Sequence, residues 1–224
     1  MKTAYRPLVA EALGTALFVF IGTASIVVNA MTSGGVTNLG IAFAHGVGMS
    51  ILISALMSVS GAHFNPAVTL GLLVAGKVDP RTGGRYVIAQ LAGAVLGALA
   101  VKAMFPAPAV NAVSSGTPQL SLNIGLAQGI AIEAMFTFFL VSAVFGTAVA
   151  KDAPKIGGFG IGLAIFVSAV VIGGLTGAAL NPARAFGPAL VSWTWHSQAV
   201  YWIGPLAGGT AAGWLWKAFL LPKA

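Results

Sequence analysis

Cysteine is absent from this chain of 224 residues. Its absence excludes a disulfide framework, a thiolate metal site and a cysteine nucleophile. Acidic residues are nearly as scarce, because Asp and Glu together number only four, and histidine numbers three. So few ionisable groups provide no paired carboxylates, no nucleophile with a base and no ligand cluster. We therefore expect no enzyme activity, no catalytic residues, no metal and no other cofactor.

Charge of either sign is also sparse, at 7% of residues against about 25% in an ordinary soluble domain. Hydrophobic residues make up 58%, and the mean hydropathy is +0.94. This balance excludes a water-soluble domain and a disordered chain. The net charge of +7 reflects missing acids rather than a clustered basic face. The expected partner is therefore a lipid bilayer and not a nucleic acid.

Six apolar runs are long enough to cross a bilayer, which requires about 20 residues of helix. They cover residues 8–31, 39–59, 83–105, 122–150, 157–174 and 199–221. With six crossings, nine basic residues fall on one side, namely Lys2, Arg6, Lys77, Arg81, Arg85, Lys151, Lys155, Lys217 and Lys223. The loops 32–38 and 106–121 on the other side carry no charge. The excess of Lys and Arg predicts a multi-pass protein of the plasma (cell inner) membrane with both termini cytoplasmic.

An internal repeat divides the chain. The segment 61–71 (GAHFNPAVTLG) recurs as 177–187 (GAALNPARAFG), at an offset of 181 − 65 = 116 residues. Each half, residues 1–105 and 122–224, holds three of the six runs, and residues 106–121 link the halves. Three crossings per half give the halves opposite orientations, which places a site near the bilayer midplane. The prediction is a single all-α channel domain over residues 1–224.

The repeated Asn-Pro-Ala motifs are the most informative feature. They comprise Asn65, Pro66 and Ala67 in the first half and Asn181, Pro182 and Ala183 in the second. Asn caps helix N-termini well, and Pro is favoured at the first helical position. Each motif is followed by about ten apolar residues, which reach about 15 Å as a helix, or half a bilayer. We therefore expect two re-entrant half-helices, 66–75 and 182–191, whose N-termini meet at the midplane.

This geometry predicts a pore with an electrostatic barrier. Each half-helix places roughly +0.5 charge at its N-terminus, which opposes cations and protons. Irregular backbone at this depth is tolerated where it lines water. It would offer carbonyl groups to small polar molecules, and the residues concerned are Gly61, Ala62, His63, Gly177, Ala178 and Ala179.

The paired motifs, Glu11 and Glu133 early in the first run of each half, and Arg184 after the second motif resemble the aquaporin, or major intrinsic protein, family. The resemblance covers the whole chain and implies a passive water channel that assembles as a homotetramer. It assigns both glutamates a structural role, as anchors of the re-entrant loops. It also implies a selectivity filter outside the motifs, formed by His45, Ala169, Ala178 and Arg184.

The filter departs from the common water-selective pattern, which has a second histidine where this chain has Ala169. The histidine at position 45 of the filter resembles the pattern of the plant tonoplast branch, some of whose members also pass ammonia or urea. Because Ala169 is smaller than histidine, we expect the ring of four filter residues to be wider. We therefore expect small neutral solutes such as ammonia to pass. Ala185 stands where the glycerol-conducting branch typically has Asp, so we expect glycerol to pass poorly.

Two other functional classes compete with a passive pore. An ion-coupled transporter can also contain inverted repeats and broken helices, but it usually needs an ion-binding carboxylate at the midplane. The repeat-related positions of Glu11 and Glu133 suit scaffolding better. A membrane enzyme lacks the necessary groups, as described above. Osmotic shrinkage measured with and without an ion gradient distinguishes a passive pore from an ion-coupled transporter.

The missing cysteine generates a prediction about inhibitors. Mercurial compounds should leave water flow unchanged, because the chain has no thiolate to bind mercury. Ala178→Cys should create sensitivity, because the resemblance places this position in the filter. Water permeability of proteoliposomes with and without a mercurial measures both effects. Thiol-reversible inhibition of the unmodified protein would contradict the prediction.

Overall fold

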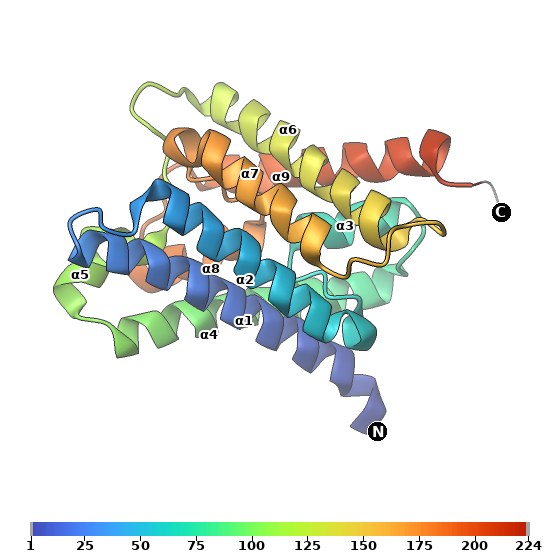
Figure 1. Cartoon of the computed structure of the whole chain (residues 1–224), viewed down its shortest axis with the longest axis horizontal. Helices are drawn as coiled ribbons and strands as arrows, with labels where there is room; N and C mark the ends of the chain where they lie inside the picture. The colour runs from blue at the N-terminus through green and yellow to red at the C-terminus, as the bar shows by residue number, and fades with distance from the viewer. Residues whose placement is uncertain (1, 223–224) are drawn as a thin grey trace.

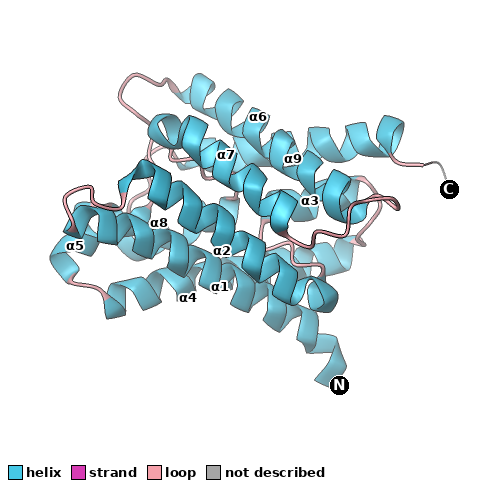
Figure 2. Cartoon of the chain, viewed as in Figure 1, coloured by secondary structure: helices cyan, strands magenta, loops and turns pink. Residues whose placement is uncertain are grey.

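The computed structural model describes residues 2–222, with side chains described from Tyr5 onward. Lys223 and the side chain of Lys2, both predicted to be cytoplasmic, lie outside this part. Within residues 2–222 the chain forms helices and loops without a strand, as Figure 2 shows. The all-α prediction is confirmed.

Six long helices match the six apolar runs. They are α1 (Lys2–Met31), α2 (Thr37–Ser60), α4 (Pro80–Met104), α6 (Leu126–Val144), α7 (Phe159–Thr176) and α9 (Gln198–Leu215). The π-helical turns η2 (Phe145–Val149) and η3 (Trp216–Leu220) extend α6 and α9. All except α9 are long and apolar enough, by length and composition, to cross a membrane. The sixth, α9, packs along α6.

Two short helices begin at the repeated motifs, as predicted. They are α3 (Pro66–Val74) and α8 (Pro182–Ser192). Asn65 and Asn181 cap them, since their side-chain oxygens accept hydrogen bonds from backbone N–H groups in the first turn. The preceding helices α2 and α7 end at Gly61 and Gly177, whose φ angles of 87° and 80° favour glycine.

The repeat is visible in the packing as well. In Figure 1, α1, α2 and α4 form one group and α6, α7 and α9 the other. Within the groups, α1 packs along α4 and α6 along α9, while α2 meets α7 between the groups. The beginning of α1, the α3–α4 and η2–α7 connections and the end of η3 lie toward the right of Figure 1. The segments with most of the basic residues thus lie at one end of the bundle.

Glycines permit the closest helix contacts. A Cβ atom at Gly93 of α4 would overlap the Ala12 carbonyl of α1, and one at Gly208 of α9 would overlap the Ala134 carbonyl of α6. Gly46 of α2 similarly faces the Gly162 carbonyl of α7. Small residues at such crossings let helix backbones approach in lipid, where van der Waals packing rather than the hydrophobic effect drives association.

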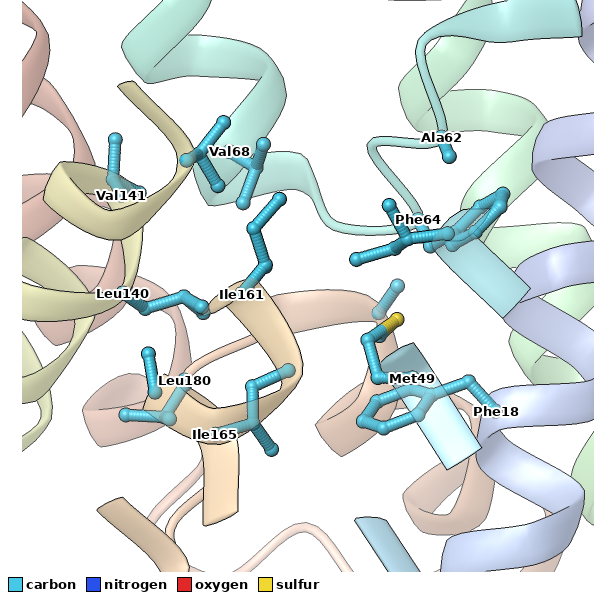
Figure 3. Close-up of a cluster of buried hydrophobic side chains, with 14 of the residues drawn as sticks. Phe18, Met49, Ala62, Phe64, Val68, Leu140, Val141, Ile161, Ile165 and Leu180 are labelled. Atoms are coloured by element: carbon cyan, nitrogen blue, oxygen red, sulfur yellow. The ribbon is translucent and has the colours of Figure 1, made fainter. Parts of the chain in front are cut away.

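The buried apolar cluster of Figure 3 brings both halves together at mid-depth. Figure 3 shows Leu140 on α6 and Ile165 on α7 near Leu180, and Met49 on α2 on the other side, near Phe18 and Phe64. This arrangement provides an apolar wall opposite the two motifs.

The close crossing of α6 and α9 generates a stability prediction. Gly208→Ala should destabilise the fold by about 1–3 kcal/mol, because the added methyl group is forced against the Ala134 carbonyl. Gly174→Ala is the matched control, since a Cβ atom there has no described atom within 4 Å. Thermal unfolding in detergent compares the two variants. Equal midpoints would show that the crossing tolerates a methyl group.

Candidate functional site

Two cavities approach each other from opposite ends of the bundle. The cavity on the side of η1 (Ser114–Gly116) has a volume of about 310 Å³ and is named the outer cavity, after the predicted orientation; the cavity on the side of Lys77 has a volume of about 280 Å³ and is named the inner cavity. Four residues line both cavities, namely Met49, Asn65, Leu140 and Ile165. The two cavities therefore converge at the first Asn-Pro-Ala motif, opposite the apolar wall.

Glu11 holds the irregular segment before the first motif. Its carboxylate is fully buried and accepts hydrogen bonds from the Ser60 hydroxyl (2.6 Å), the His63 N–H (3.0 Å), the Phe64 N–H (2.8 Å) and the Gln90 amide (2.8 Å). These backbone N–H groups have no helical partner, and leaving them unsatisfied in a membrane would cost several kcal/mol each.

Glu133 repeats this arrangement in the second half. It is also fully buried and accepts hydrogen bonds from the Thr176 hydroxyl (2.6 Å), the Ala179 N–H (3.0 Å) and the Leu180 N–H (2.7 Å). The geometry fits the structural role that the family resemblance implies for both glutamates, and neither of them lines the outer or the inner cavity.

The anchored segments adopt strained backbone conformations in a matching pattern. Ala62 and Phe64 have φ angles of 51° and 50°, and their counterparts Ala178 and Leu180 have 46° and 54°. Left-handed conformations cost on the order of 1–3 kcal/mol for residues other than glycine. The hydrogen bonds to the glutamates keep each segment in this form.

The two motifs are bonded to each other. The side-chain amide of Asn65 donates to the Leu180 carbonyl, and that of Asn181 donates to the Phe64 carbonyl, both at 2.9 Å. Each bond uses one of the two N–H donors of an amide. Within the described part of the chain, one donor of each amide therefore remains for a molecule between the motifs.

Arg184 lies in the first turn of α8 and lines the outer cavity. It is 4% exposed, and its Nη1 donates to the Gly116 carbonyl at 3.1 Å, while its Nε has no partner among the described residues. Gly116 ends η1, in which Ser114, Ser115 and Gly116 all have positive φ angles. The segment 106–121, expected to be a plain linker, thus forms α5 (Ala107–Ala112) and η1 and fixes the guanidinium.

His45 lines the outer cavity with its ring against α1. Its Nδ1 donates to the Ile41 carbonyl at 2.8 Å, so the Nε2 atom is the free edge in the neutral ring. A Cβ atom at Gly22 would overlap that edge, so the glycine makes room for the imidazole. The Phe18 ring packs edge-on at 5.8 Å. The sequence carried no signal for Gly22.

The other two predicted filter residues, Ala169 on α7 and Ala178 before the second motif, line the same cavity, as do Gly177 and Ala179. Part of this wall was not predicted from the sequence. It comes from the loop after α5 and comprises Val113, Gly116, Thr117, Pro118 and Gln119. Nothing in that loop marks a pore residue, because its lining role depends on how it folds over α8.

The inner cavity is lined by Gly61, Ala62 and His63, together with Lys77, which the sequence analysis did not place in a pore. The Thr69 hydroxyl donates to the Asn65 carbonyl at 3.1 Å and accepts from the Gln90 amide at 3.0 Å. Its second lone pair accepts from the His63 Nδ1, also at 3.0 Å. His63 is therefore oriented by a polar network.

A family model for the major intrinsic proteins matches residues 1–216. The chain belongs to this family. Its members are channels rather than enzymes, so the protein is a passive channel for water and small solutes that crosses the membrane several times.

Individual relatives support this membership. The chain is 37% identical to "Aquaporin TIP4-4" of Zea mays over 97% of its own length and 88% of that protein. It is 36% identical to "Aquaporin-8" of Rattus norvegicus, over 96% and 81%. The aquaglyceroporin structure from Plasmodium falciparum superposes with a TM-score of 0.84, covering 96% of each chain at 24% identity, and supports the fold.

Proposed function

We propose that each chain forms one pore that conducts water and ammonia and excludes protons and ions. The observation that carries this proposal is the composition of the outer cavity. Arg184 and His45 line this cavity together with Ala169 and Ala178, and the two alanines leave space that larger side chains would fill. A wider ring beside a fixed positive charge favours neutral solutes larger than water.

Ion exclusion rests on charge at two levels of the pore. The N-termini of α3 and α8 meet near Asn65 and Asn181, and each contributes roughly +0.5 charge. Arg184 adds a full charge in the outer cavity, where the surrounding dielectric is low. Desolvating ammonium next to these charges is costly, whereas neutral ammonia does not meet this barrier.

Glycerol should pass poorly. His45 lines the outer cavity with an imidazole, where the carbon backbone of glycerol would need an apolar wall. Ala185 is fully buried and packs in a small cluster with Val200 and Tyr201. The side chain after the second Asn-Pro-Ala-Arg sequence is therefore apolar, unlike the typical glycerol branch.

An ion-coupled transporter is the alternative, and the positions of the carboxylates argue against it. Glu11 and Glu133 are both fully buried and bonded to backbone N–H groups, and neither lines the outer or the inner cavity. A coupling carboxylate must meet its ion in the pathway. Osmotic shrinkage that depends on an ion gradient would favour the transporter.

The proposed setting is the plasma membrane, with both termini cytoplasmic and four chains in a homotetramer. The segments with most of the basic residues lie at one end of the bundle, which supports the orientation. Membership in the family supports the tetramer. The proposal includes no catalytic step and no cofactor.

The charge barrier predicts the behaviour of Arg184→Val. With folding confirmed by water permeability, this variant should raise proton permeability, because the fixed charge in the outer cavity is lost. Arg184→Lys keeps the charge and should keep the barrier. A pH-sensitive dye inside proteoliposomes reports the proton flux. Equal proton flux in the valine variant and the unmodified protein would count against the role of Arg184.

The width of the ring predicts the behaviour of Ala169→His. The larger side chain should narrow the outer cavity and reduce ammonia flux more than water flux. Ala169→Ser, which is small and polar, should leave the ratio of the two fluxes unchanged. Osmotic water permeability and ammonia-driven alkalinisation are measured on the same proteoliposomes. Equal proportional losses, or no ammonia flux through the unmodified protein above empty liposomes, would refute the assignment.

A further inference from the structure

One face of α7 becomes progressively smaller toward the outer mouth of the pore. Ile165, Ala169 and Gly173 follow each other at intervals of four residues on one side of α7, and Gly177, at the same interval, caps the end of the helix. All four line the outer cavity. The pore-facing side chain therefore shrinks from Ile165, where the two cavities converge, to no side chain at Gly173, one helical turn beyond Ala169.

Packing does not explain the glycine at position 173. A Cβ atom at Gly46, Gly162 or Gly208 would overlap a neighbouring helix, whereas one at Gly173 has no described atom within 4 Å. Glycine inside a helix costs up to about 1 kcal/mol relative to alanine. Gly173 is partly buried and lines the cavity, so what its missing side chain leaves is open pore space.

A second, independent feature of the same cavity is a buried donor that a polar molecule in the pore could satisfy. The Nε atom of Arg184 is buried and has no hydrogen-bond partner within the described part of the chain, although Nη1 is bonded to Gly116. Buried donors without a partner are costly in a folded protein. A solute with a hydrogen-bond acceptor that reaches this part of the cavity would satisfy the donor.

We propose that Gly173 is a second selectivity-determining position, which sets the width of the approach to Arg184. The missing side chain admits neutral solutes that carry a hydrogen-bond acceptor and are broader than ammonia, such as a small planar amide. The inference rests on the proposed function, since it assumes that solutes other than water use this pore. A solute that enters from the outer mouth therefore passes Gly173 first, and this position limits the size of the solutes that reach the ring of His45, Ala169, Ala178 and Arg184.

Cysteine substitution tests whether Gly173 lies in the pathway, and it needs only water flux. Because the chain has no cysteine, Gly173→Cys carries a unique thiol. Water permeability is compared before and after reaction with methyl and then benzyl methanethiosulfonate. The benzyl adduct should reduce water flow to the level of empty liposomes, and the methyl adduct should reduce it less. In Ala178→Cys, inside the narrower ring, both adducts should block.

Gly174→Cys is the matched control. Gly174 is the next residue on α7, its Cβ position is equally open, and it is exposed on the outside of the helix rather than lining the cavity. Neither reagent should change its water permeability. Equal responses of the two variants to the benzyl reagent would overturn the placement of Gly173 in the pathway.

A second pair of variants tests selectivity. Gly173→Leu should lower the ratio of formamide flux to water flux, whereas Gly174→Leu should leave the ratio unchanged; leucine favours helix at both positions. Both fluxes are measured by light scattering on the same proteoliposomes. An unchanged ratio in Gly173→Leu would overturn the proposal. Failure of the proposed function would be seen separately, because the unmodified protein would then conduct no ammonia. Gly173→Cys and Gly174→Cys would still report, through water permeability, whether Gly173 lies in the pathway.

Discussion

Two buried carboxylates determine the shape of the pore. Glu11 and Glu133 each accept hydrogen bonds from backbone N–H groups in a segment with no helical partners, and each thereby holds residues with positive φ angles. Only with those segments fixed can Asn65 and Asn181 begin half-helices that meet at mid-depth. In a soluble protein, water could satisfy such a loop from every side, but in a bilayer the N–H groups that face away from the pore must find their partners within the protein.

Much of this architecture could be predicted from the sequence. Hydropathy located the six long helices, and the Asn-Pro pairs located the starts of α3 and α8, because capping and the fixed φ angle of proline are local properties. The repeat then determined how the halves are oriented. The structural role of the glutamates was expected from the family resemblance, and the geometry supplies its physical reason.

Other features depend on contacts between distant segments and could not be predicted in this way. The bond from Arg184 to the Gly116 carbonyl depends on the fold of a loop without charge or motif. The space for the His45 ring depends on Gly22 of another helix. The halves also differ where the repeat would suggest similarity: Thr69 belongs to a polar network with Gln90 beside the first motif, whereas its counterpart at the offset of 116 residues is Ala185, which is apolar.

The crossed hydrogen bonds between the motifs have a consequence for biosynthesis. The amide of Asn65 is bonded to the Leu180 carbonyl, so the first half lacks one of its pore contacts until the second half is made. The ribosome must add 180 − 65 = 115 more residues, which at about 5–20 residues per second takes on the order of ten seconds. During this interval the first three helices are already available for insertion, while their re-entrant loop waits for its partner. Assembly of the complete pore from its two halves is therefore a late step of membrane insertion.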